Sequence, residues 1–379
     1  MKRLFKFLLS TVFLVVLLFS AYALISGRTY LFKAVWYNFA DIDDYKVFTN
    51  NTITTGAHQP WPVSGQYNKQ PIPDSLKNKL EALKTVALLA IKNDSILAEQ
   101  YWDGYTDSSW SGSFSMAKSI TSLLIGAAIK DSLIRSVGQP VAEFLPEFAQ
   151  DPYKAQVTIE QLLSMSSGSN WDESYSNPLS VTTELYYGSD AYAAATGVKI
   201  VKPSGTEFRY KSGDTQLLGL VLEKATGKSL SAYAAEKLWH PIGAEHPALW
   251  STDHTGGHEK AYCCFNSNAR DFARIGQLML DSGRWKGQAI ITPDYFARSI
   301  RPHGLTDEHG QKVDYYGYQW WIFPGKEQVF YARGILGQYI IVIPSRRVVL
   351  VRLGHQRSGQ IINHAPAEVA SLVNWGLQL

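Results

Sequence analysis

The chain begins with its most apolar segment. Three basic residues within the first six positions precede an uncharged run from Phe7 to Ile25. A run of this length can cross a bilayer as a helix, and its basic flank predicts a cytoplasmic N-terminus with the body exported. Because Ala21-Tyr22-Ala23 also fits a cleavage site, residues 1–25 are either a membrane anchor or a removed signal peptide. Tyr30 and Trp36 follow at interface distance and favour the anchor.

The next part of the chain shows no clear periodicity. Residues 26–75 contain four prolines and a polar stretch at 50–52, which indicates an irregular arm or linker. Short apolar runs at 86–91 and 96–102 follow, separated by Asn93-Asp94. They predict two strands joined by a turn.

The rest of the pattern is mostly helical in the middle and strand-like near the C-terminus. Helices are predicted at 158–165, 215–225 and 268–280. Later apolar runs predict strands at 316–323, 329–332, 339–343 and 348–353, before a last helix at 366–379. Strands at both ends indicate an α+β body over residues 76–379, with one antiparallel sheet and a mostly helical insertion at about 130–310.

The segment that begins at Ser115 carries the candidate chemistry. Residues 115–129 read SMAKSITSLLIGAAI, a helix apolar nearly all round, which belongs in the interior. Ser115 and Lys118 are three apart and share one helix face. A serine hydroxyl needs a base, and a lysine serves when burial and the positive helix end lower its pKa. Free backbone N–H groups at the same helix end can hold an oxyanion.

Composition and spacing narrow the function further. The formal net charge is +3 with no basic block, which argues against a nucleic-acid-binding protein. His254 and His258 flank Gly256-Gly257 without an H-E-x-x-H pattern, so we expect no metal site, and no cofactor is implied. A G-x-S-x-G elbow is also missing, which disfavours an α/β-hydrolase. Because a ring between neighbouring cysteines is strained, we predict that Cys263 and Cys264 are buried thiols, with a redox switch as the alternative.

Several motifs in order resemble one known superfamily. They are SMAK (115–118), LLSMSSGSNWDESY (162–175), PSGTEFRYKSGDTQLLGLVLE (203–223), RDFARIGQLML (270–280), YGYQWW (316–321) and GILGQYIIVIP (334–344). Over roughly residues 80–375 the chain is similar to the serine β-lactamase and penicillin-binding-protein superfamily, whose first motif is S-x-x-K. It is most similar to the class C β-lactamase-related branch with the 6-aminohexanoate-dimer hydrolases. The resemblance implies a sheet flanked by N- and C-terminal helices.

The resemblance assigns roles to the second motif, Tyr210-Lys211-Ser212. It implies that the Tyr210 phenol lies near the Ser115 hydroxyl and takes part in its proton transfer. A tyrosinate beside a lysinium is a plausible base, and the phenol can protonate a leaving amine; the alternative is a core tyrosine. Ser212 stands where the lactamases place Asn and is expected to support substrate binding.

The third motif of the lactamases, K-T-G, is replaced here by Ala332-Arg333-Gly334. Gly334 is retained and fits close approach of a substrate strand, and the resemblance implies that the N–H groups of Ser115 and Ile335 form the oxyanion site. The missing lysine argues against efficient β-lactam hydrolysis and favours a neutral amide or ester, or a short oligomer of amino acids. By the same resemblance, Trp171 and Tyr175 line the substrate cleft; the alternative is ordinary aromatic packing.

The sequence therefore predicts a serine hydrolase that cleaves a small-molecule amide or ester through an acyl-enzyme. It is expected to be exported, either anchored in the inner membrane facing the periplasm or free in the periplasm after cleavage. Two alternatives remain: a penicillin-binding protein, acting as a D,D-peptidase or cell-wall sensor, and a non-catalytic relic used for binding. The oligomeric state is left open.

Overall fold

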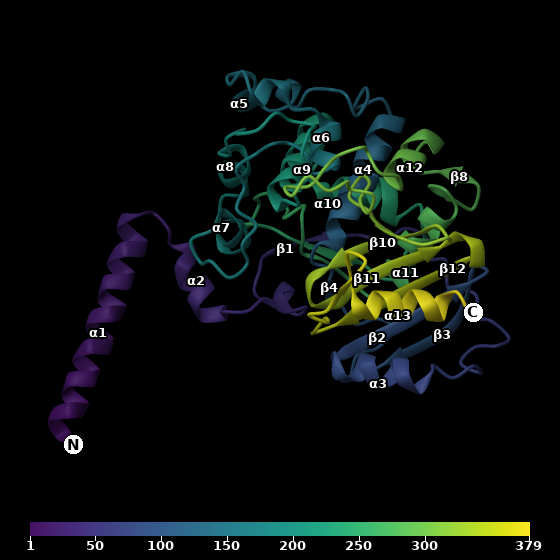
Figure 1. Ribbon diagram of the computed structural model, residues 1–379, viewed down its shortest axis with the longest axis horizontal. Helices are drawn as coiled ribbons and strands as arrows, with labels where there is room; N and C mark the ends of the chain where they lie inside the picture. Colours follow the sequence, from purple (N-terminus) through teal and green to yellow (C-terminus); the bar gives the residue numbers. More distant parts are fainter.

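A six-stranded antiparallel sheet assembled from both ends of the chain forms the centre of the protein (Figure 1). The computed structural model describes residues 1–379. β2 (Thr85–Lys92) and β3 (Ser95–Tyr101) are joined through Asn93 and Asp94, both at positive φ, as a two-residue hairpin requires. The order is β3-β2-β12-β11-β10-β9, with β9 (Trp321–Phe323), β10 (Val329–Gly334), β11 (Gln338–Ile343) and β12 (Val348–Gly354). The predicted α+β class is confirmed.

Helices cover both faces of this sheet. α11 (Ala269–Leu280) packs on one face, and α3 (Asp74–Ala82) and α13 (Ala367–Gly376) pack on the other. Side chains alternate between the two faces, so that Leu89 joins the core under α11 and Leu88 joins the core under α13. Because both faces are buried, these strands read as continuous apolar runs in the sequence.

The predicted strand at 316–323 is shorter in the structure. β9 begins only at Trp321, because the preceding residues turn, with Gln319 at φ 63°. The Gln319 amide donates hydrogen bonds to the carbonyls of Leu162 and Leu163, so this turn ties the sheet to the helical region. An apolar string does not reveal such a turn.

The helical region also contains a second sheet, which the sequence pattern did not predict. Its order is β1-β5-β6-β4, with β1 (Asn50–Ile53), β5 (Ala248–Ser251), β6 (Phe265–Ser267) and β4 (Ser111–Gly112). β1 lies in the segment 26–75, which also contains α2 (Tyr30–Tyr37), so the expectation of an irregular arm is wrong there. Strands this short cannot show a period of two, and their partners lie far apart along the chain.

Two long helices, α4 (Met116–Lys130) and α9 (Ser212–Thr226), form the interior of the helical region. The helices predicted at 158–165, 215–225 and 268–280 correspond to α6 (Ile159–Leu163), α9 and α11. The other helices are short: α5 (Pro146–Ala149), α7 (Val181–Tyr187), α8 (Ala191–Thr196), α10 (Leu230–Ala234) and α12 (Pro293–Ser299). Two small ribbons pair β7 (Arg284–Trp285) with β8 (Gln288–Ala289) and β13 (Ile361–Ile362) with β14 (Ala365–Pro366).

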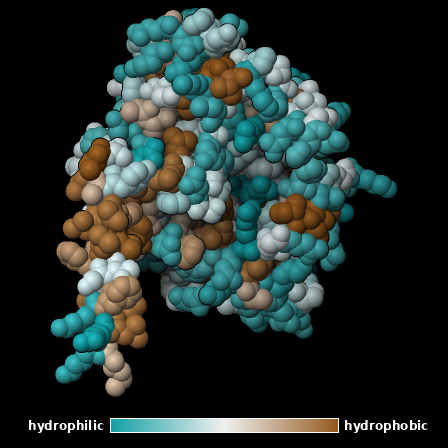
Figure 2. Space-filling model, turned by 60° about the vertical axis from the view of Figure 1, so that its left-hand side comes forward, coloured by the Kyte–Doolittle hydropathy of each residue, from teal (hydrophilic) through white to brown (hydrophobic).

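The first helix, α1 (Lys2–Ile25), projects away from the body (Figure 1). Its length and composition suffice to cross a membrane. Ala23 is its only buried residue, and most of its apolar side chains are exposed (Figure 2). The short helix α2 folds back beside its last turns and connects it to the body.

Candidate active site

Ser115 lies at the N-terminal end of α4, directly after β4 of the second sheet. β4 ends at Gly112, and Phe114 then adopts a positive φ of 43° before the helix begins. Such a turn presents the next side chain at the helix end, where backbone N–H groups are free. α4 is buried from Met116 to Ala128, so a helix apolar on all sides fills the interior, as its sequence predicts.

Lys118 is 1% exposed, and its amine points at the hydroxyl of Ser115. Nζ donates to Ser115 Oγ at 3.2 Å, to Ser212 Oγ at 3.1 Å and to the carbonyl of Tyr262 at 3.0 Å. Burial lowers the pKa of Lys118 to about 8, although the nearby Glu173 carboxylate acts in the opposite direction. A substantial neutral fraction therefore exists near neutral pH, and a neutral amine can accept the Ser115 proton.

Tyr210 completes this group from the other side. Its ring centroid lies 5.1 Å from the Lys118 amine, and Ser115 is close enough to its hydroxyl to influence the Tyr210 pKa. Burial raises the pKa of Tyr210 well above its usual value, and the neighbouring Ser115 side chain offsets only part of this rise. The phenol is therefore protonated at neutral pH, so the expected tyrosinate base is not the resting form. The hydroxyl can still pass a proton on.

Gly334, at the end of β10, lies against the turn before Ser115. An added Cβ there would lie 2.2 Å from the Ser113 carbonyl oxygen and 3.2 Å from Phe114 Cβ. Only glycine permits this approach, which brings Ile335 into the same cavity wall as Ser115. Ile335 is the first residue of a helical turn, so its N–H has no partner within that turn. The glycine was expected to make room for a substrate strand; in the structure it makes room for the protein's own backbone.

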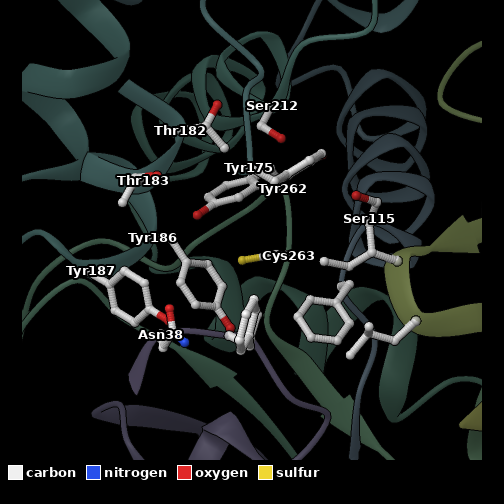
Figure 3. Close-up of a pocket in the computed structure, with 15 residues that line it drawn as sticks. Asn38, Ser115, Tyr175, Thr182, Thr183, Tyr186, Tyr187, Ser212, Tyr262 and Cys263 are labelled. Carbon is white, nitrogen blue, oxygen red and sulfur yellow. The ribbon is translucent and has the colours of Figure 1, made fainter. Parts of the chain in front are cut away.

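Ser115 borders a cavity of about 250 Å³ (Figure 3). Of the predicted site residues, Ser115, Tyr175, Ser212 and Ile335 line it, whereas Lys118, Tyr210 and Gly334 do not. Most of the other lining residues are apolar or aromatic. They come from the segment after α2, from α7 and from three further loops or turns: Asn38, Phe39, Ala40, Phe114, Thr182, Thr183, Tyr186, Tyr187, Tyr262, Cys263 and Leu336. The geometry thus offers a serine, a buried amine and free backbone N–H groups at the edge of a largely apolar chamber.

Residues 75–371 match the Beta-lactamase family, and this match covers most of the chain. The chain belongs to the β-lactamase family. Its S-x-x-K, tyrosine and Gly334 motifs stand in the order that this family resemblance implies. The chain is accordingly a serine hydrolase of the amidase and esterase type that works through an acyl-enzyme.

Three proteins show what this chain is similar to in sequence or in fold. The 6-aminohexanoate-dimer hydrolase of Paenarthrobacter ureafaciens is 29% identical over 74% of this chain and 75% of its own length. The structure of a proposed 6-aminohexanoate-dimer hydrolase from Bacillus anthracis is 24% identical, with a TM-score of 0.76 over 89% of this chain and 91% of that chain. A family VIII carboxylesterase has the same fold at 18% identity, with a TM-score of 0.64 over 84% of this chain and 99% of that chain.

One central residue of the site, Glu173, was missed by sequence reasoning. Its carboxylate accepts hydrogen bonds from the N–H and hydroxyl of Ser212, both at 2.6 Å. It also accepts from the indole of Trp171 at 2.8 Å and from the hydroxyl of Tyr175 at 2.6 Å. In the sequence, only its position midway between Trp171 and Tyr175 of the 162–175 motif could have indicated a role for Glu173, because a single glutamate in a loop forms no pattern.

Trp171 does not line the cavity. Its side chain is buried behind Glu173, and its indole packs on the first turn of α9, where a Cβ at Gly213 would lie 2.3 Å from the ring. Besides Glu173, the indole N–H contacts the Thr182 hydroxyl at 2.9 Å. Trp171 therefore holds the loop in place, and only Tyr175 of the predicted aromatic pair reaches the cavity.

The two cysteines differ from the prediction. Cys263 and Cys264 are joined as a disulfide rather than present as separate thiols. Cys264 has a positive φ of 64°, and this turn allows neighbouring sulfurs to meet. Cys263 lines the cavity, and the preceding residue supplies the carbonyl that binds Lys118. The structure contains no group of three or more His, Cys, Asp or Glu side chains that could hold a metal ion.

Proposed function

We propose that this protein is an exported, membrane-anchored hydrolase of neutral carboxylic esters or amides, with Ser115 as its nucleophile. One observation carries the proposal: the Lys118 amine, 1% exposed and with its pKa lowered to about 8, lies 3.2 Å from Ser115 Oγ. A lysine in this setting can take the serine proton, which is the step that a serine hydrolase of this type requires.

The reaction would begin when neutral Lys118 accepts the proton of Ser115. The alkoxide attacks the substrate carbonyl, and the N–H groups of Ser115 and Ile335 bind the resulting oxyanion. The protonated phenol of Tyr210 gives its proton to the leaving oxygen or nitrogen and recovers one from Lys118. Water then attacks the acyl-enzyme, with the same residues removing its proton, and the carboxylic acid leaves.

The cavity lining contains no Lys, Arg or His, which favours a substrate without a carboxylate beside the scissile bond. Arg333, which stands close to where the lactamases carry the K-T-G lysine, lies 3.5 Å from the ring centroid of Trp321 and donates to the carbonyl of His364. With that cation engaged elsewhere, β-lactam binding loses an expected partner. A neutral ester or amide, with 6-aminohexanoate dimer as one candidate, fits better, and we expect Tyr175 and Ser212, which line the cavity, to contact its polar groups.

The proposal of export and anchoring rests on α1. This helix is apolar and exposed, and basic residues precede it. We expect residues 1–25 to remain attached, with 76–379 as the hydrolase domain outside the inner membrane. If the protein is anchored, it stays with the membrane fraction after an alkaline carbonate wash. A soluble periplasmic product that starts near Leu24 would instead indicate signal cleavage.

A substrate panel tests the catalytic proposal. The full-length protein is assayed with p-nitrophenyl esters, 6-aminohexanoate dimer, D-amino-acid peptides and nitrocefin, and labelled with a fluorophosphonate probe. Ser115→Ala should abolish both turnover and labelling. Ser231→Ala is a matched control, because the Ser231 hydroxyl is buried without a hydrogen-bond partner. Equal turnover by the parent and Ser115→Ala would refute the assignment.

The same panel separates the alternatives. A lasting one-to-one adduct with nitrocefin and no released product would indicate a penicillin-binding sensor. Folded protein that neither reacts with the probe at Ser115 nor turns over any substrate would indicate a binding relic.

A further inference from the structure

We propose that the cavity opens at the surface of the bilayer and takes a membrane-held substrate, an ester or amide of a fatty-acyl chain. This inference rests on the proposed hydrolase function and on anchoring through α1. It goes further by naming the substrate class and the direction from which the substrate enters.

The first observation is how α2 packs on α1. The Phe32 ring of α2 meets the Phe19 ring of α1 edge to face at 5.6 Å, and Ala23 is fully buried in a cluster with Tyr30 and Leu31. Phe19 precedes the end of α1 by six residues, about 9 Å along a helix axis. When α1 spans the membrane, α2 therefore lies at the depth of its last turns, within the outer interface of the bilayer.

The second observation is the outward surface of α2 and the residue after it. Val35, Trp36 and Phe39 are 62%, 83% and 80% exposed. Neighbouring apolar side chains with such exposure mark a contact surface, and aromatic residues are favoured at the level of lipid headgroups. Figure 2 shows apolar side chains gathered where α1 meets the body, although the exposed residues Ser26, Thr29 and Lys33 interrupt them. A bilayer that already surrounds α1 would cover this surface as well.

The third observation connects this surface to Ser115. Asn38, Phe39 and Ala40, directly after α2, form part of the cavity wall, so Phe39 belongs both to the membrane surface and to the cavity. α2 is fixed in this position by the stacking of Tyr37 on Tyr187 of α7, with ring centroids 6.3 Å apart. α7 supplies further lining residues on the same side, opposite Ser115 (Figure 3).

These observations describe a path that is apolar from the bilayer to the nucleophile. An acyl chain could leave the lipid along Phe39 and lie among the aromatic side chains of α7 while its carbonyl reaches Ser115 and Ile335. The head of the substrate would stay at the level of the lipid headgroups. A small polar substrate gains nothing from such a path. For soluble esters that enter from water, each acyl methylene buried in the cavity should raise kcat/KM about fourfold until the cavity is full, whereas a chain already dissolved in lipid gains access to Ser115 rather than this transfer energy.

The test uses the full-length protein in phosphatidylcholine vesicles with two substrates. p-Nitrophenyl acetate reports the chemistry from the aqueous phase, and p-nitrophenyl palmitate dissolved in the vesicles reports entry from the bilayer. Trp36→Ser should leave acetate hydrolysis unchanged and lower palmitate hydrolysis at least fivefold. Tyr153→Ser is the matched control, because Tyr153 is another exposed aromatic residue, 67% exposed against 83% for Trp36, but follows α5 rather than lying in α2. This substitution should change neither rate.

The outcomes separate the two levels of the proposal. If acetate hydrolysis depends on Ser115 but palmitate in vesicles is not cleaved, or if Trp36→Ser and Tyr153→Ser affect it equally, membrane entry is refuted and the hydrolase function stands. If the parent protein cleaves neither ester and does not react with the fluorophosphonate probe, the hydrolase function fails and this inference falls with it. Unchanged acetate hydrolysis by Trp36→Ser also shows that this variant is folded.

Discussion

Removing the buried charge at Lys118 should change the stability of the protein in a way that depends on pH. In the unfolded chain this amine has its ordinary pKa of 10.5, whereas in the folded protein burial lowers it to about 8. Below pH 8 the amine is charged in both states, and burial of that charge costs folding about 3 kcal/mol. Between pH 8 and 10.5 the folded protein loses the proton while the unfolded chain keeps it, so this cost disappears as the pH rises.

Lys118→Met is the appropriate perturbation, because it keeps most of the side-chain volume and removes the charge. The variant gains about 3 kcal/mol at pH 7 from the missing charge and loses about 1–3 kcal/mol because Ser212 Oγ and the Tyr262 carbonyl are left without this partner. The net difference at pH 7 is therefore small. Its change with pH is not: the parent should gain about 3 kcal/mol relative to the variant between pH 7 and 10.5.

The assay is chemical denaturation in mild detergent, followed by tryptophan fluorescence, for both proteins across this pH range. All other titrating groups are common to the two proteins, so their contributions cancel in the difference. The variant should also have no esterase activity, while kcat/KM of the parent should rise with a midpoint near pH 8. A stability difference that stays constant from pH 7 to 10.5 would show that the Lys118 pKa is not lowered. This result would refute Lys118 as the base that activates Ser115.

Three further substitutions test the remaining parts of the site. Glu173→Gln removes a carboxylate that raises the Lys118 pKa, so the pH–rate midpoint should move to lower pH; a shift to higher pH contradicts this reasoning. Gly334→Ala places a Cβ about 2.2 Å from the Ser113 carbonyl oxygen and should lower kcat with little change in KM; unchanged kinetics would argue against the Ile335 oxyanion site. Tyr210→Phe should slow amide hydrolysis by about 100-fold or more, because an amine must be protonated to leave. It should affect p-nitrophenyl esters much less, and an equal loss on both substrates would point to a structural role.

The parts of the site that follow from local spacing were predictable from the sequence. Ser115 and Lys118 are one helical turn apart on a helix with no polar face, so burial of the amine followed from the sequence. The hairpin at Asn93-Asp94 was equally local, since two turn residues stood between two apolar runs. The order of several motifs then pointed to the family and to its sheet formed by both chain ends.

The features that were missed depend on contacts between distant segments. Glu173 contacts Ser212, which is 39 positions later in the sequence. No local pattern around Glu173 indicates that its carboxylate accepts four hydrogen bonds. β1 pairs with β5 almost two hundred positions later through only four residues on each strand, which is too short for a detectable period. The disulfide between Cys263 and Cys264 needed a positive φ that local preference does not favour.

The packing of α2 on α7 connects α1, the proposed membrane anchor, to the active site through direct contacts, which a simple tether would not need. A tether needs only length, but α2 stacks on α7 through Tyr37 and Tyr187, and the residues after α2 close one side of the cavity. The same α7 holds Thr182, whose hydroxyl contacts the Trp171 indole behind Glu173. A chain of side-chain contacts therefore runs from α2 through α7 and Trp171 to Glu173. Glu173 in turn accepts a hydrogen bond from Ser212 and raises the Lys118 pKa, so the proposed membrane contact and the proposed proton transfer share one structural element.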